Sequence, residues 1–96
     1  MNENIGSYGM KWIEFMERNY PNLTCELKAE NRLEEIACSV DEEAWEYRFL
    51  LDSQYAKAHP RPLDGFEDLT AWERTCQFYT DGAVMRERVL VLRTAA

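Results

Sequence analysis

The sequence predicts an all-α fold, a compact bundle of four to five helices arranged around one long central helix. Apolar residues recur at three- and four-residue steps through most of the chain, and prolines or glycines separate these stretches. A lone strand would need a partner strand, and the chain offers no second candidate. With 96 residues, the chain fits one domain: residues 1–7 are expected to be a flexible N-terminus and residues 8–96 a single helical domain.

The first predicted helix starts at Tyr8, with Ser7 as its candidate N-cap. Pro21 ends this helix, and Asn22 can cap a short second helix that runs to about residue 30. Residues 32–38 form another brief apolar patch and are predicted to be helical. The apolar stripe of the first helix consists of Tyr8, Trp12, Phe15 and Met16.

The long central helix is predicted over Ser39–Ala58. Ser39 and Glu42 have the spacing of a capping box, in which each side chain bonds a free backbone N–H of the first turn. Pro60 marks the end, because the residue before a proline avoids helical geometry. Its main apolar stripe consists of Val40, Ala44, Tyr47, Leu51, Tyr55 and Ala58.

Trp45 and Phe49 lie on the far side of this helix, at about 100° per residue. A helix that is apolar on two sides is usually sandwiched between neighbours, and we favour that interpretation. The alternative is that Trp45 and Phe49 anchor a binding partner.

A loop is predicted at residues 59–66, where two prolines and a glycine occur. Asp68 can cap the last helix, and Gly82 is a candidate for a kink or break because glycine costs about 1 kcal/mol against alanine in a helix. Residues 89–92, VLVL, are predicted to be helical, with a short strand as the alternative. A second stripe in this helix consists of Phe78, Gly82, Met85, Val89 and Leu92.

The cysteines and the histidine indicate neither a metal site nor a disulfide framework. Cys25, Cys38 and Cys76 are widely spaced and odd in number, so we expect reduced, mostly buried thiols. His59, the one histidine, lies beside prolines and is interpreted as a loop residue. A Cys–His nucleophile pair finds no support in the spacing. We therefore expect no enzyme, no catalytic residues, no cofactor and no metal.

The negative charge is concentrated in one segment. The net charge is −7, and residues 26–46 hold eight acids against two bases, which gives −6. This balance disfavours direct binding to nucleic acid and favours a protein partner with a basic surface. The chain has no run of about 20 apolar residues that would span a membrane and no basic, apolar start typical of a signal peptide, so a cytoplasmic location is expected.

Residues 7–23, SYGMKWIEFMERNYPNL, followed by a short leucine-bearing segment and by Asp41–Leu51, resemble the small TnpV-like proteins of conjugative transposons in gut Firmicutes. The closing segment Leu69–Trp72 also resembles the tryptophan-bearing last helix of that family. Two departures are the replacement of the usual Ser-Gly-Lys-Leu link by residues 29–33 and the absence of Met-Asn-Asn after the tryptophan. The resemblance implies an all-helical accessory protein of a mobile element and brings no established biochemical activity.

Three hypotheses follow. The first is a non-catalytic acidic protein that binds a protein partner and inhibits a host nucleic-acid-binding machine, such as a CRISPR effector, by occupying its basic surface as a nucleic-acid mimic. The second is a self-associating structural or regulatory protein, such as a homodimer, with either the two-sided central helix or the Phe78–Leu92 stripe as its dimer face. The third is a small-molecule or nucleotide binder that uses Trp12, Trp45 and Trp72. The candidate protein-binding residues are Glu34, Glu35, Asp41, Glu42, Glu43, Glu46, Trp45 and Phe49.

Overall fold

The computed structural model describes residues 5–95, which contain four α-helices and no strand. The helices are α1 (Ser7–Asn19), α2 (Pro21–Ala29), α3 (Leu33–Ala58) and α4 (Phe66–Val84), and a π-helical turn, η1 (Met85–Val89), continues α4. The predicted all-α class is confirmed, as is a single long helix, α3. The flexible N-terminus predicted for residues 1–7 falls mostly outside the described residues, and Ser7 already belongs to α1.

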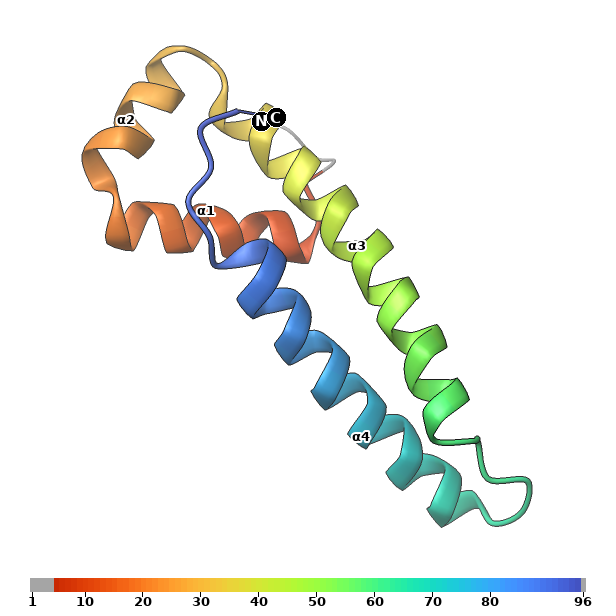
Figure 1. The fold of residues 1–96 in the computed structure, drawn as a ribbon. Coiled ribbons are helices and arrows are strands. Elements are labelled where there is room, and N and C mark those ends of the chain that lie inside the picture. The colour runs from red at the N-terminus through yellow and green to blue at the C-terminus, as the bar shows by residue number, and fades with distance from the viewer. Residues whose placement is uncertain (1–4, 96) are drawn as a thin grey trace.

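The molecule is more extended than the compact bundle that we expected. Its radius of gyration is 16.3 Å, against about 12–13 Å for a globular domain of this length. Helices α3 and α4 run antiparallel as a hairpin, and α1 and α2 lie at one end of that hairpin only (Figure 1). We call the end with α1 and α2 the head. We call residues 49–80, where α3 and α4 contact no other helix, the arm.

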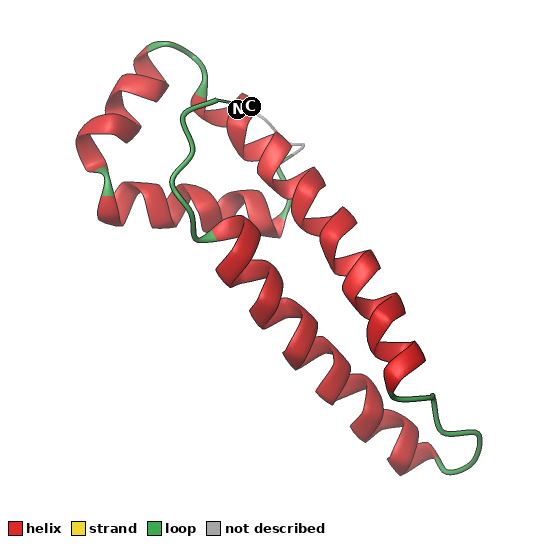
Figure 2. Ribbon diagram, viewed as in Figure 1, coloured by secondary structure: helices red, strands yellow, loops and turns green. Residues whose placement is uncertain are grey.

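The core lies in the head. There α1 crosses α3, and the segment after η1 passes across α1 toward the start of α3 (Figure 2). The indole N–H of Trp12, which is fully buried, donates to the backbone carbonyl of Val91 at 3.1 Å. The main buried side chains are Tyr8, Trp12, Met16, Leu27, Leu33, Ile36, Val40, Val84 and Val89.

Helix α3 spans 26 residues without interruption, so the predicted capping box at Ser39 is wrong. The chain turns at Asn31, which has a left-handed φ of 58°, and the helix then starts at Leu33. Leu33, Ile36 and Ala37 are buried in line with Val40. Because a helix in a protein draws most of its stability from the face it packs, this continuous apolar stripe outweighs the local cap at Ser39.

The other predicted helix starts also differ from the observed ones. Helix α1 begins at Ser7, helix α2 begins at Pro21 and helix α4 begins at Phe66, after Gly65 with a φ of 89°. None of the side chains at these N-caps makes a capping hydrogen bond. Proline suits the first turn of α2 because the N–H that it lacks would be unpaired there anyway. Ser7, Asn22 and Asp68 are therefore not the caps that we predicted.

The end of the chain departs from prediction as well. Gly82 does not break α4, which continues to Val84 and then widens into the π turn. Residues 90–95 lie outside any helix or strand, so the helix predicted at 89–92 is wrong apart from Val89. The backbone carbonyl of Val91 instead accepts a hydrogen bond from Trp12. This bond takes the place of the backbone hydrogen bond that the carbonyl would accept if the helix continued.

Three helices meet at the hydroxyl of Tyr8. This hydroxyl donates to Asp81 of α4 at 2.6 Å and accepts from Arg48 of α3 at 2.9 Å. Burial and the Asp81 hydrogen bond raise the pKa of Tyr8 to about 12. The head is thus fastened to the start of the arm by a polar contact as well as by apolar packing.

Candidate protein-binding face

The acids of α3 divide among three sides of the helix. At about 100° per residue, Glu35, Glu42 and Glu46 fall within about 40° of one another and opposite the buried stripe. All three side chains are exposed. Phe49 lies one turn further along the same side and is 77% exposed. We call Glu35, Glu42, Glu46 and Phe49 the outer face of α3.

The acids of this outer face are not paired with basic side chains of the described part of the chain. Within residues 5–95, Glu35, Glu42 and Glu46 have no ion pair with a lysine or arginine. They lie about 10 Å and 6 Å apart along the axis, at 1.5 Å per residue. A row of uncompensated carboxylates at this spacing creates a local negative potential that attracts cationic side chains.

Asp41 has a different role, which sequence reasoning missed. Its Oδ1 accepts hydrogen bonds from the backbone N–H groups of Tyr8 and Gly9, both at 3.1 Å. The carboxylate therefore caps α1 from another helix, where the unpaired N–H groups and the positive end of the helix dipole favour a negative charge. Asp41 fastens α1 to α3 and points away from the outer face.

Glu43 faces the C-terminal segment. Arg93 donates to its two carboxylate oxygens at 2.5 and 3.2 Å. This hydrogen bonding holds the pKa of Glu43 below its ordinary value. A forked arginine–carboxylate pair of this kind neutralises the charge inside the molecule. Glu43 therefore contributes little negative potential for a partner.

Glu34 lies in the first turn of α3 and is exposed. It borders a cavity between α1, the end of α2 and the start of α3, together with Met10, Ile13 and Lys28. Glu34 is thus on the side of α3 that faces α1 and α2, apart from Glu35, although the two residues are adjacent in sequence.

Trp45 and Phe49, which we predicted to be sandwiched between neighbours, are not equivalent. Trp45 is 42% exposed and packs edge-on against Tyr8, with ring centroids 5.0 Å apart. The guanidinium of Arg48 also lies over the Trp45 ring, 5.3 Å from its centroid. No such ring contact involves Phe49 among the described residues. The prediction that the side chain lies between neighbouring helices is therefore wrong for Phe49. It holds in part for Trp45, which packs on Tyr8 but remains partly exposed.

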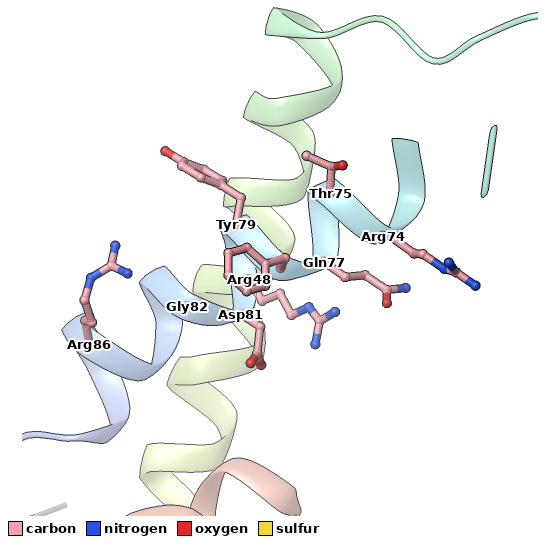
Figure 3. Close-up of a pocket in the computed structure, with 9 residues that line it drawn as sticks. Arg48, Arg74, Thr75, Gln77, Tyr79, Asp81, Gly82 and Arg86 are labelled. Atoms are coloured by element: carbon pink, nitrogen blue, oxygen red, sulfur yellow. The ribbon is translucent and has the colours of Figure 1, made fainter. Parts of the chain in front are cut away.

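A second surface lies on α4, where the sequence offered the Phe78–Leu92 stripe as a possible dimer face; Phe78 and Gly82 of that stripe line it, whereas Val89 is buried. An open groove is lined by Arg74, Thr75, Phe78, Gly82 and Arg86, and Arg48 reaches its edge from α3 (Figure 3). Phe78 is 85% exposed. The stripe of Phe78 and Gly82 is visible in the sequence, but the sequence does not say that it faces away from α3.

The features that catalysis would need lie apart. Burial and the nearby Asp52 raise the pKa of the Cys76 thiol, whereas a nucleophilic cysteine needs a lowered pKa. Of the three cysteines only Cys76 is buried, whereas Cys25 is exposed and Cys38 is half-buried, so the expectation of mostly buried thiols is wrong. Trp12 lies in the core and Trp72 packs on Tyr55 in the arm. No set of three or more metal-binding side chains is grouped within residues 5–95.

The chain matches no family model, no curated protein and no solved structure. Every helix in the described part of the chain is too short or too polar to cross a membrane. The site is therefore interpreted from its own geometry.

Proposed function

We propose that this protein is a non-catalytic acidic accessory protein of a mobile genetic element that binds a protein partner through the outer face of α3. The observation that supports this proposal is the alignment of Glu35, Glu42 and Glu46, exposed and without an ion pair among the described residues, beside the exposed ring of Phe49. Charged rows of this kind steer a basic partner, and an aromatic side chain adds apolar contact at close range.

The partner class follows from the charge. A basic surface in a protein commonly serves to hold the phosphate backbone of DNA or RNA. An acidic helix face can occupy such a surface in place of the nucleic acid. The proposed action is therefore inhibition of a host nucleic-acid-binding machine, such as a CRISPR effector. The link to mobile elements rests on the resemblance of residues 7–90 to TnpV-like proteins alone.

A comparison of two triple variants tests the proposal. The first, Glu35→Gln with Glu42→Gln and Glu46→Gln, removes three charges from the outer face. The matched control, Glu14→Gln with Glu26→Gln and Asp64→Asn, removes three exposed charges elsewhere, none of which has an ion pair among the described residues. Each tagged protein is used to capture partners from host lysate at low and at high salt, and the captured proteins are identified and quantified.

The proposal predicts that a nucleic-acid-binding protein is retained by the wild type at low salt and released at high salt, because salt screens exposed charges beyond about 8–10 Å. The control variant should retain it and the outer-face variant should lose it. Capture that ignores salt, or that both variants keep equally, would rule this mechanism out.

Self-association is the second candidate function, and a specific observation favours it. Within the arm, no residue from 52 to 75 is buried. The two helices are held together there by contacts of Tyr55 with Trp72 and Tyr79 on their partly exposed surfaces, and not by a buried core. A second molecule that covers the arm would supply the missing contacts.

A further inference from the structure

The side of α4 that faces away from α3 carries a regular seam. Ala71, Thr75, Phe78 and Gly82 follow steps of four, three and four residues, the spacing with which two helices pack in a coiled coil. The side of α4 that packs on α3 holds Cys76, Thr80 and Ala83 instead. The outward seam consists of small residues around one large ring, and the ring of Phe78 is almost wholly exposed.

Gly82 has no reason to be glycine within its own molecule. It is inside a helix, where glycine is less stable than alanine. A side-chain methyl group at this position would meet only the guanidinium tip of Arg86, at 3.4 Å, an ordinary contact. The position favours glycine if another chain approaches the backbone closely there.

The charges beside the seam are arranged for a second copy in the opposite direction. Glu67 and Asp68 lie in the first turn of α4, and Arg86 lies in η1 just after the end of α4, with its guanidinium tip beside Gly82. An antiparallel pair of α4 helices brings the acidic start of each against the basic end of the other. A parallel pair would place like charges together, which is unfavourable.

We propose that the protein forms a twofold-symmetric homodimer in which the outward seams of two α4 helices pack antiparallel. When Phe78 lies opposite Thr75 of the second copy, Ala71 lies opposite Gly82 and Glu67 lies opposite Arg86. Because the dimer is twofold-symmetric, each of these pairs occurs twice. The large ring of each helix then meets the small residues of the other. The same surface serves on both copies, as a twofold interface requires. Helix α4 of the arm, which lacks buried residues beyond its contact with α3, becomes the centre of the interface.

The dimer is tested by sedimentation equilibrium from low to high micromolar protein, with Phe78→Ser and Phe49→Ser as a matched pair. Both phenylalanines are exposed and both lie in the arm, so neither change is expected to unfold the head, and circular dichroism checks this. Phe78→Ser should raise the dissociation constant more than about tenfold, because it removes the central anchor. Phe49→Ser should leave it unchanged. A wild type that stays monomeric at every concentration, or a dimer that only Phe49→Ser disrupts, would overturn the proposal.

Charge reversal tests the antiparallel register. Glu67→Arg and Arg86→Glu should each weaken the dimer, and the two together should restore it, because the pair is then reversed and not broken. A double variant that dissociates as much as the two single variants combined would overturn this register. The dimer does not depend on the acidic outer face. The triple variant at Glu35, Glu42 and Glu46 should therefore dimerise like the wild type, and this result keeps the dimer test separate from the partner-binding test.

Discussion

The hydroxyl of Tyr8 donates a 2.6 Å hydrogen bond to Asp81, a residue 73 positions further along the chain. This contact joins the first turn of α1 to the part of α4 where the arm enters the head. Because Arg48 donates to the same hydroxyl at 2.9 Å, one side chain links three helices. The stability of the head therefore depends on a residue that local helix propensity would not single out.

Tyr8→Phe removes both hydrogen bonds and keeps the ring. We expect the free energy of unfolding to fall by about 1–3 kcal/mol, because Arg48 and Asp81 lose a partner in a partly buried place. Urea denaturation followed by circular dichroism measures this. Tyr20→Phe is the control, since the exposed Tyr20 side chain makes no hydrogen bond within residues 5–95. Equal effects of the two changes would contradict the role of the Tyr8 hydroxyl.

The raised pKa of Tyr8 predicts a stability change at high pH. The folded protein holds the phenol proton up to about pH 12, whereas the unfolded chain releases it near 10.0. Deprotonation therefore favours unfolding, and the contribution of Tyr8 is complete below pH 10 and falls as the pH rises to 12. We expect the stability difference between wild type and Tyr8→Phe to shrink between about pH 10 and pH 12. A difference that stays constant over this range would show that the Tyr8 pKa is not raised.

Asp41→Ala should destabilise the protein by about 1–2 kcal/mol, because it leaves the N–H groups of Tyr8 and Gly9 without their acceptor. Asp41→Asn should cost less, since the amide oxygen still accepts. Glu42→Ala, at the next residue and on the exposed side, should change stability by less than about 0.5 kcal/mol. Thermal or urea unfolding distinguishes the three, and a larger loss for Glu42→Ala would contradict the capping role.

Two glycine-to-alanine changes should have opposite signs. At Gly9 a methyl group would lie 2.6 Å from the backbone carbonyl oxygen of Ala37, so Gly9→Ala should separate α1 from α3 and destabilise the protein. At Gly82 a methyl group would meet only the flexible tip of the Arg86 side chain, at 3.4 Å, so Gly82→Ala should stabilise the monomer by up to about 1 kcal/mol. Unfolding is measured at low protein concentration, where the monomer dominates. Changes of the same sign at both positions would contradict the packing described here.

Arg93→Gln should bring the pKa of Glu43 back up toward 4.5, because Arg93 is the main cause that lowers it. Carboxyl chemical shifts followed through a pH titration by NMR measure this directly. Arg86→Gln is the control, as Arg86 is not among the causes of the shift. A Glu43 pKa that is the same in wild type and in Arg93→Gln would mean that the C-terminal segment does not pack on α3 in solution.

The all-helical class could be predicted because apolar spacing reports directly which face of a helix is buried. The helix starts could not, because their stabilising partners lie elsewhere. Asp41 caps α1 across 32 residues, and no local pattern marks it. At Ser39 the local signal is a proper capping box, but the buried residues before it keep the helix continuous. Tertiary packing outweighed local preference there.

The acidic segment could be found from composition, but not its division among sides of the helix. Glu42 and Glu43 are neighbours in sequence, yet one is free on the outer face and the other is paired with Arg93 among the described residues. That pairing needs residues 90–95 to leave the helical path, and the apolar VLVL run favoured helix. The Phe78–Leu92 stripe was a predicted dimer face, but the sequence could not divide it: Phe78 is exposed, whereas Val89 is buried in the core. A stripe shows a preference for contact, but not whether the contact lies inside the same molecule.

The outer face of α3 and the seam of α4 point away from each other across the hairpin. A pair of molecules joined through the seam would therefore leave both acidic faces uncovered and hold them at a fixed separation. Such an assembly is bivalent: once one face is bound, the other is presented to a repeated target at a high effective concentration, and avidity can exceed single-site affinity by about 10²–10⁴-fold.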